Sequence, residues 1–120
     1  MAKILIHVTT GPDDPTKAAL SFVVAKTALG EGHEVSLFLA GEGVRLLSEG
    51  VLDTVEGVGT GKLQEHFDAI VAAGGRFYLS GMSAKARGFD EALIADRPAE
   101  FAMPDVLVRL LVESDRSLTY

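Results

Sequence analysis

Apolar residues occur along this chain in two alternating patterns. Short runs rich in aliphatic and β-branched residues predict buried strands, and longer segments with apolar residues every three or four positions predict helices. The strands are expected at residues 3–8, 34–39, 76–79, 100–102 and 117–120, and the helices at 15–29, between Thr60 and Gly74, at 89–95 and after Pro104. Regular alternation of strand and helix is typical of a parallel sheet that is covered on both faces. We therefore expect a three-layer α/β/α fold in a single domain, residues 1–120.

Particular residues are predicted to begin and end these helices. Asp14 is expected to cap the first helix, whose first position holds Pro15. Thr60 is expected to cap the helix that ends at Gly74. Residues 50–59 are interpreted as a loop with at most a single turn. The final helix is expected to bury three leucines, Leu107, Leu110 and Leu111.

The composition limits the classes of function. The 120 residues are 48% hydrophobic and carry a net charge of −6, so the chain should be compact and nucleic acid is not an expected partner. The absence of cysteine excludes disulfides, thiolate metal sites and thiol chemistry in this chain. The three histidines share no helical face, and neither a metal site nor a cofactor is predicted. The apolar runs are too short for a membrane span and no secretion signal is recognised, so a cytoplasmic location is expected.

Three loops are expected to meet at one edge of the sheet, because ligands of such folds bind at the carboxyl ends of the strands. These loops follow the first three strands, at residues 9–14, 40–43 and 80–87. The candidate ligand-binding residues on them are Thr9, Thr10, Asp13, Gly41, Gly43, Ser80, Gly81, Ser83, Lys85 and Arg87.

The segment 80–88 carries the strongest chemical signal. Gly81 permits a tight turn after the strand, and Ser83 is placed to cap the helix that follows. Free backbone N–H groups at the start of that helix, together with Lys85 and Arg87, favour a bound anion. The same residues fit equally well a strand–helix turn whose cations are solvated or form salt bridges between subunits.

The same segment resembles the DsrE/DsrF-like family, in particular its small YchN-like members. The resemblance covers the whole chain and rests on the order and spacing of five segments, 11–16, 32–35, 38–44, 80–88 and 113–116. It implies a flavodoxin-like, mostly parallel five-stranded sheet and assembly into trimers or hexamers. In the sulfur-relay branch of the family, a cysteine at the end of the third strand accepts a persulfide, and relatives often carry a second cysteine three residues later. The matching positions here are Ser80 and Ser83.

A serine cannot take over this chemistry, because a hydroxyl is far less acidic than a thiol and forms no persulfide. We therefore expect a non-catalytic, DsrE-like oligomeric binding or scaffold protein that works with a sulfur-relay partner protein or binds a small anion. The apolar segments 51–52 and 101–103 have no obvious helix face to pack on within the chain, which favours a homo-oligomer.

Two alternatives remain open. The first is a small hydrolase or transferase with Ser80 or Ser83 as nucleophile, for which His7 is the one base expected to come near. The second is a module that binds a nucleotide or a flavin, which the fold permits although the chain carries no fingerprint for either ligand.

Overall fold

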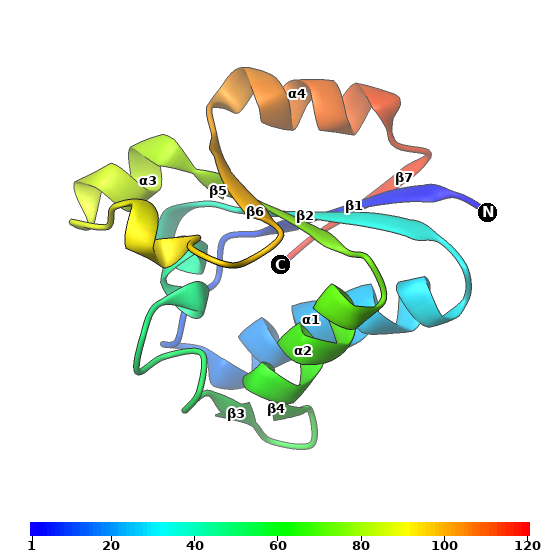
Figure 1. The fold of residues 1–120 in the computed structure, drawn as a ribbon. Helices are drawn as coiled ribbons and strands as arrows, with labels where there is room; N and C mark the ends of the chain where they lie inside the picture. Colours follow the sequence, from blue (N-terminus) through cyan, green and yellow to red (C-terminus); the bar gives the residue numbers. More distant parts are fainter.

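The computed structural model describes all 120 residues, from Met1 to Tyr120, around a central sheet. The sheet has five strands in the order β6-β5-β2-β1-β7, and every neighbouring pair is parallel (Figure 1). The strands are β1 (Lys3–Val8), β2 (Glu34–Leu39), β5 (Arg76–Ser80), β6 (Ala99–Ala102) and β7 (Arg116–Thr119). The predicted α/β fold with a five-stranded parallel sheet is confirmed.

Helices cover both faces of the sheet (Figure 1). The elements are α1 (Pro15–Gly30), α2 (Leu63–Ala72), α3 (Gly81–Ala86), α4 (Pro104–Glu113) and the 3₁₀ helices η1 (Gly41–Leu47) and η2 (Glu91–Leu93). The chain moves in one direction across the sheet from β1 through β2 to β5. Because both crossovers are right-handed, α1 and α2 lie on the same face. The helix α4 returns the chain to β7 at the opposite edge, and a right-handed crossover in that direction places it on the other face. None of the helices has the length and apolar character needed to cross a membrane.

The order of the strands differs from that of flavodoxin. Numbered along the chain, the five strands of this sheet run 4-3-2-1-5, whereas flavodoxin has the order 2-1-3-4-5. The protein is therefore flavodoxin-like in its layers and in its parallel sheet, with an order in which the last strand is added beside the first.

The two faces of the sheet differ in chemistry. The face under α1 and α2 is wholly apolar in its interior; it is built from Ile4, Ile6, Val8, Val35, Leu37, Leu39, Phe77 and Leu79. Aromatic rings packed at a tilt join this face to both helices, with centroid distances of 5.7 Å from Phe22 to Phe77 and 5.1 Å from Phe67 to Phe77. The alternate positions, which face α4, mix apolar and polar side chains and include Leu5, His7, Ser36, Phe38, Tyr78 and Ser80. The main core thus lies on one side of the sheet.

The segment between η1 and α2 is more ordered than the predicted loop. The strands β3 (Glu56–Gly57) and β4 (Gly61–Lys62) form a small antiparallel hairpin. Its turn is possible because Gly59 and Gly61 both have φ of +74°, in the left-handed region that glycine adopts without strain. The predicted cap at Thr60 is wrong, because the hairpin occupies that residue and α2 begins after Lys62 without a side-chain cap. Asp14 caps α1 as predicted, by accepting a 3.1 Å hydrogen bond from the N–H of Lys17.

Two predicted helices are corrected. Within residues 89–95 only Glu91–Leu93 are helical, as a single 3₁₀ turn, which Asp90 caps by accepting a 3.0 Å hydrogen bond from the N–H of Ala92. In α4 the prediction of three buried leucines is wrong: Leu107 and Leu110 are half-buried, and Leu111 keeps 51% of its surface exposed. No residue of α4 is fully buried within the chain.

Candidate functional site

The loops after β1, β2 and β5 meet at the carboxyl edge of the sheet. The N–H of Gly41, at the start of η1, donates a 2.8 Å hydrogen bond to Ser83 Oγ in α3. Gly43 lies so close to the end of β1 that an added Cβ would overlap the carbonyl oxygen of Val8. Glycines at these two positions therefore let η1 fit between β1 and α3.

Ser80 is the last residue of β5 and caps α3. Only 7% of its surface is exposed, and its Oγ accepts a 3.1 Å hydrogen bond from the N–H of Ser83. The predicted cap at Ser83 is therefore wrong. The helix begins at Gly81, because Ser80 leaves the strand with a backbone that turns its hydroxyl toward the N–H three residues later.

Both hydroxyls of this turn are engaged with the backbone. Ser80 accepts from Ser83, and Ser83 accepts from Gly41. Neither hydroxyl contacts a histidine or a carboxylate, and His7 lies on β1, separated from β5 by the strand β2. Since a serine nucleophile needs an adjacent base, neither side chain is activated in this arrangement.

Arg87 already uses two of its three side-chain nitrogens in hydrogen bonds within the chain. Its Nε donates a 2.7 Å hydrogen bond to Glu42 Oε2, and its Nη1 donates to the carbonyl oxygen of Ser83 at 3.1 Å. Arg45 donates to Glu42 Oε1 at 2.8 Å and lies 3.6 Å from Asp13. Hydrogen bonds from Arg87 and then from Arg45 lower the pKa of Glu42. The site thus contains a chain of four alternating charges.

Glu42 and Arg45 were not among the predicted site residues. The two residues are three positions apart within η1, and this spacing is the signal that could have suggested the pair, because residues three apart are neighbours on a helix. The partner of the pair, Arg87, lies 45 residues further along the chain, and no local pattern indicates that contact.

The remaining predicted residues take no part in the side-chain hydrogen bonds of Ser80, Ser83 and Arg87. Thr9 Oγ1 donates to the carbonyl oxygen of Tyr120 at 3.1 Å, which turns this side chain toward β7 and away from α3. Thr10 is half-buried and its hydroxyl makes no hydrogen bond in the chain. Lys85 is exposed on α3 and has no carboxylate within salt-bridge distance. Gly81 begins α3 beside Ser80.

His7 carries the one buried side-chain nitrogen or oxygen atom that has no hydrogen-bond partner. Its Nε2 atom is buried and makes no hydrogen bond, and its ring packs edge-on against Phe38 with 6.0 Å between ring centroids. Burial lowers the pKa of His7, because the charged form loses hydration. The imidazole lies on the face of the sheet that α4 covers.

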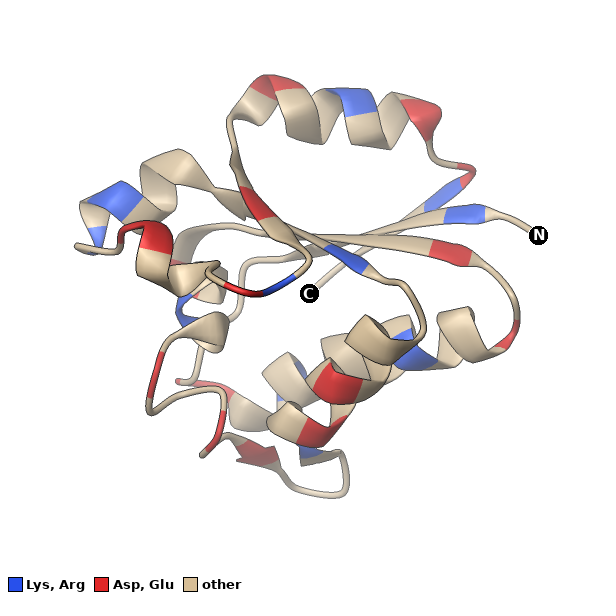
Figure 2. Cartoon of the chain, in the orientation of Figure 1, with Lys and Arg blue, Asp and Glu red and all other residues tan.

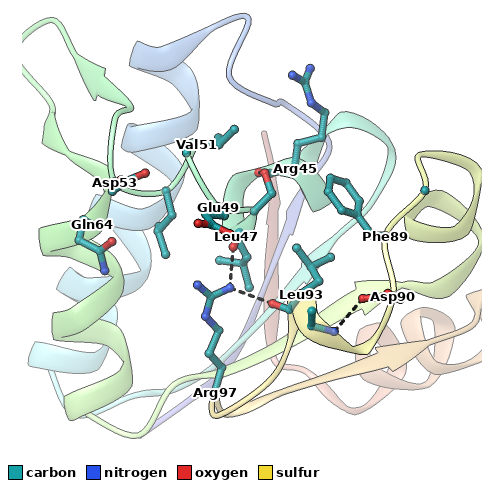
Figure 3. Close-up of a pocket in the computed structure, with 15 residues that line it drawn as sticks. Arg45, Leu47, Glu49, Val51, Asp53, Gln64, Phe89, Asp90, Leu93 and Arg97 are labelled. Atoms are coloured by element: carbon teal, nitrogen blue, oxygen red, sulfur yellow. Dashed lines mark hydrogen bonds between the residues drawn. The ribbon is translucent and has the colours of Figure 1, made fainter.

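A cleft of about 690 Å³ is lined by residues of segments 45–53 and 88–97 together with Gln64, and Ser80 is not among them (Figure 3). The turns that follow η1 and α3 form two of its walls, and α2 contributes Gln64. Arg97 lies at its base, where Nη1 donates to the carbonyl oxygens of Leu47 at 2.5 Å and Leu93 at 2.8 Å (Figure 3). Nothing in the local sequence predicts this cleft, because its walls come from segments about 40 residues apart.

Comparisons with known proteins agree with the fold of the chain. The fold matches the crystal structure of the YchN protein from E. coli with a TM-score of 0.84 at 20% identity, over 100% of both chains. It also matches BT1422, a conserved protein of unknown function from Bacteroides thetaiotaomicron, with a TM-score of 0.72 at 16% identity, over 99% of this chain and 95% of that one. No curated protein sequence matches significantly. The family model for DsrE/DsrF-like proteins matches residues 2–120, and the chain therefore belongs to the DsrE/DsrF-like family.

Proposed function

We propose that this protein is a non-catalytic DsrE-like subunit, which assembles into an oligomer and acts as a binding or scaffold component related to sulfur relay. The observation that carries the proposal is at the turn from β5 to α3. The chain has no cysteine, and the hydroxyls of Ser80 and Ser83 both accept hydrogen bonds from backbone N–H groups.

The chemistry of sulfur transfer supports a non-catalytic role. A carrier must attack a persulfide with a thiolate, which is available near neutral pH because a thiol titrates at about 8.5. A hydroxyl needs a base to become a nucleophile, and neither Ser80 nor Ser83 has one in contact. A fluorophosphonate probe should therefore label neither serine, and labelling of either one would favour the alternative of a serine hydrolase.

The helix α4 supports the proposal of assembly. It packs on the sheet through three residues, Val106, Leu107 and Leu110. A second apolar side faces away from the sheet and includes Val108 and Val112, with 58% and 79% of their surfaces exposed, beside Leu111. The charged residues of α4 are four positions apart and form a single stripe between the two apolar sides (Figure 2). A helix that is apolar on two sides needs a second surface to cover it.

The coverage of this face of the sheet is also incomplete. A helix of ten residues is about 15 Å long, and α4 alone crosses the face from β6 to β7. Met82 and Met103 are exposed near the start of α4, where Met103 Sδ lies close to Gly81. A partner subunit seated on α4 would cover these methionines together with Val112. We expect trimers or hexamers on the basis of the family resemblance.

Light scattering after size-exclusion chromatography tests this proposal directly. The expected mass is three or six times that of the 12.7 kDa chain, and it should persist on dilution. A monomer at every concentration would contradict a scaffold built from this chain alone.

A small anion is the ligand that we propose for the turn at Ser80, close to Lys85 and Arg87. Glu42 lies against Arg87 at 2.7 Å, so its negative charge repels an anion that approaches this guanidinium. Calorimetry with sulfate should therefore show weaker binding for Arg87→Ala and tighter binding for Glu42→Gln. Equal affinity in both variants, or no binding to the parent protein, would contradict an anion site here.

A further inference from the structure

The cleft lined by segments 45–53 and 88–97 contains a cation that no carboxylate of the chain neutralises. Arg97 has no acidic partner within 4.0 Å, whereas the arginines Arg45, Arg76, Arg87 and Arg109 each have at least one. Its guanidinium lies 5.5 Å from the centroid of the Phe67 ring, which covers one of its faces. Its position is held by two hydrogen bonds from a single nitrogen, Nη1, to the carbonyl oxygens of Leu47 and Leu93.

The other edge of this guanidinium is open. Arg97 Nε and Nη2 make no hydrogen bond within the chain. They are nevertheless not buried, because His7 Nε2 is the one buried side-chain nitrogen or oxygen that lacks a partner. The two Arg97 nitrogens therefore remain accessible at the base of the cleft, where the guanidinium lies between Gln64 and Leu93 (Figure 3). An edge that presents Nε and Nη2 side by side matches the two oxygens of a carboxylate.

Six of the fifteen residues that line the cleft are hydrophobic. The hydrophobic residues that line the cleft are Leu47, Val51, Leu52, Phe89, Ala92 and Leu93. The volume of about 690 Å³ lies within the range of sites that hold small organic molecules. A cleft with apolar side chains on its walls and a fixed cation at its base suits a ligand with an apolar body and an acidic end.

The rim of the cleft restricts the charge of that ligand. Glu49, Asp53 and Asp90 line it and are exposed, and none of them forms a salt bridge. The second cation of the lining, Arg45, is already paired with Glu42 and lies close to Asp13. Three acidic groups around one available cation repel a doubly charged anion more strongly than a singly charged one.

We propose that this cleft binds a small monocarboxylic acid with an aliphatic or aromatic body, whose carboxylate accepts hydrogen bonds from Arg97 Nε and Nη2. The apolar part of the ligand lies against Leu52, Phe89 and Leu93. This site goes beyond the proposed role in assembly, because it uses neither the turn at Ser80 nor the outer side of α4.

Titrations of the ¹⁵N-labelled protein, followed by amide chemical shifts, test this proposal. Phenylacetate and hexanoate are the probes, with phenylacetamide as a neutral match and inorganic phosphate as a more highly charged anion. The carboxylates should shift amides in residues 48–53 and 88–93 and should bind at least about tenfold more tightly than either control ligand. Arg97→Ala and Arg97→Lys should both weaken carboxylate binding, because lysine keeps the charge but lacks the two parallel donors. Arg76→Ala, which breaks an exposed ion pair elsewhere, should leave it unchanged.

A variant that leaves Arg97 in place keeps the test decisive if Arg97→Ala fails to fold. Ala92 lines the cleft and its side chain is exposed, so Ala92→Phe should fill the space, abolish carboxylate binding and preserve the amide spectrum elsewhere. Absence of any shift with both carboxylates would overturn the proposal. Undiminished binding to Ala92→Phe, or phosphate binding as tight as that of phenylacetate, would overturn it as well.

Discussion

Arg87 Nε donates a 2.7 Å hydrogen bond to Glu42 Oε2, which joins the helix after β5 to the segment after β2. Arg45 binds the other carboxylate oxygen at 2.8 Å, so Glu42 lies between two guanidinium groups that lower its pKa. The carboxylate therefore holds together the region in which the family resemblance places sulfur chemistry.

This contact predicts a change in acid stability. Because the pKa of Glu42 is lower in the folded protein, ionised Glu42 stabilises the fold above its unfolded pKa of about 4.3, and this contribution is lost as the pH falls through the folded pKa. Glu42→Gln should therefore lose less stability than the parent between about pH 5 and pH 3. Urea midpoints measure the effect. Glu34→Gln, which removes only an exposed 3.9 Å contact with Lys3, is the control and should follow the parent.

His7 predicts a second pH dependence, in a higher range. Because burial lowers the pKa of His7, the unfolded chain takes up the proton first, near the ordinary value of 6.5. The stability associated with the neutral ring is complete above that pH and decreases as the pH falls toward the folded pKa. His7→Phe keeps an aromatic edge against Phe38 and removes the unpaired nitrogen, so its thermal midpoint should change less between about pH 7 and pH 5. A profile identical to that of the parent would contradict this assignment. His33→Gln, which retains an acceptor for the N–H of Ala2, is the control.

The outer side of α4 predicts a charge-sensitive assembly. Val112→Glu introduces a charge within the proposed interface and should shift the light-scattering mass toward that of the monomer. The folded chain should tolerate it, because 79% of this residue is exposed. Val58→Glu is the matched control, since Val58 is a valine with 87% exposure on the hairpin between β3 and β4. An oligomer unaffected by Val112→Glu would place the interface elsewhere.

A thiol at the end of β5 should restore an acceptor of sulfur. In Ser80→Cys, the thiolate would attack the outer sulfur of a persulfide donor, form a cysteine persulfide and release the donor as a thiol. The N–H groups at the start of α3 and the nearby Lys85 favour the thiolate that this step requires. Intact-mass spectrometry should detect the added sulfur in Ser80→Cys and none in the parent. Ser48→Cys is the control, because Ser48 is similarly buried at 9% exposure but does not begin an α-helix. Equal uptake of sulfur by both variants would show that the start of α3 does not make a thiol at position 80 a better sulfur acceptor.

The close approach of η1 to β1 predicts a large cost for one added methyl group. In Gly43→Ala the Cβ would overlap the carbonyl oxygen of Val8, so the backbone must move and the free energy of unfolding should fall by about 1–3 kcal/mol. Gly30→Ala is the matched control. Its Cβ meets nothing within 4 Å at the end of α1, where alanine is the better helix former, so it should be neutral or slightly stabilising. Chemical denaturation of both variants distinguishes the two outcomes.

The layers of the fold could be predicted because each strand is short, apolar and separated from the next by a helical pattern. The cap at Asp14 is likewise a local feature, since it depends on an N–H three residues away. The caps expected at Thr60 and Ser83 failed for a tertiary reason. Thr60 belongs to a hairpin that packs beside α1, where its Oγ1 donates to the carbonyl oxygen of Thr16, and Ser83 Oγ binds the N–H of Gly41.

The candidate site was predictable as a meeting of three loops, but its contacts were not. The pairing of Arg87 with Glu42 depends on how far α3 and η1 extend from the sheet, which no local pattern determines. The open edge of Arg97 depends on two 3₁₀ helices that end close together. Sequence indicates which residues reach an edge of the sheet, and packing decides which of their charges remain available.

The pairing of β7 with β1 also has a consequence for how the protein is made. The strand β7 is the last of the five to leave the ribosome, and it pairs with β1, the first, through partners such as Ile4 and Arg116. Until then β1 is the edge of an incomplete sheet, and its outer backbone groups can pair with any extended chain nearby. Nascent protein should therefore be most prone to aggregation just before its final strand emerges.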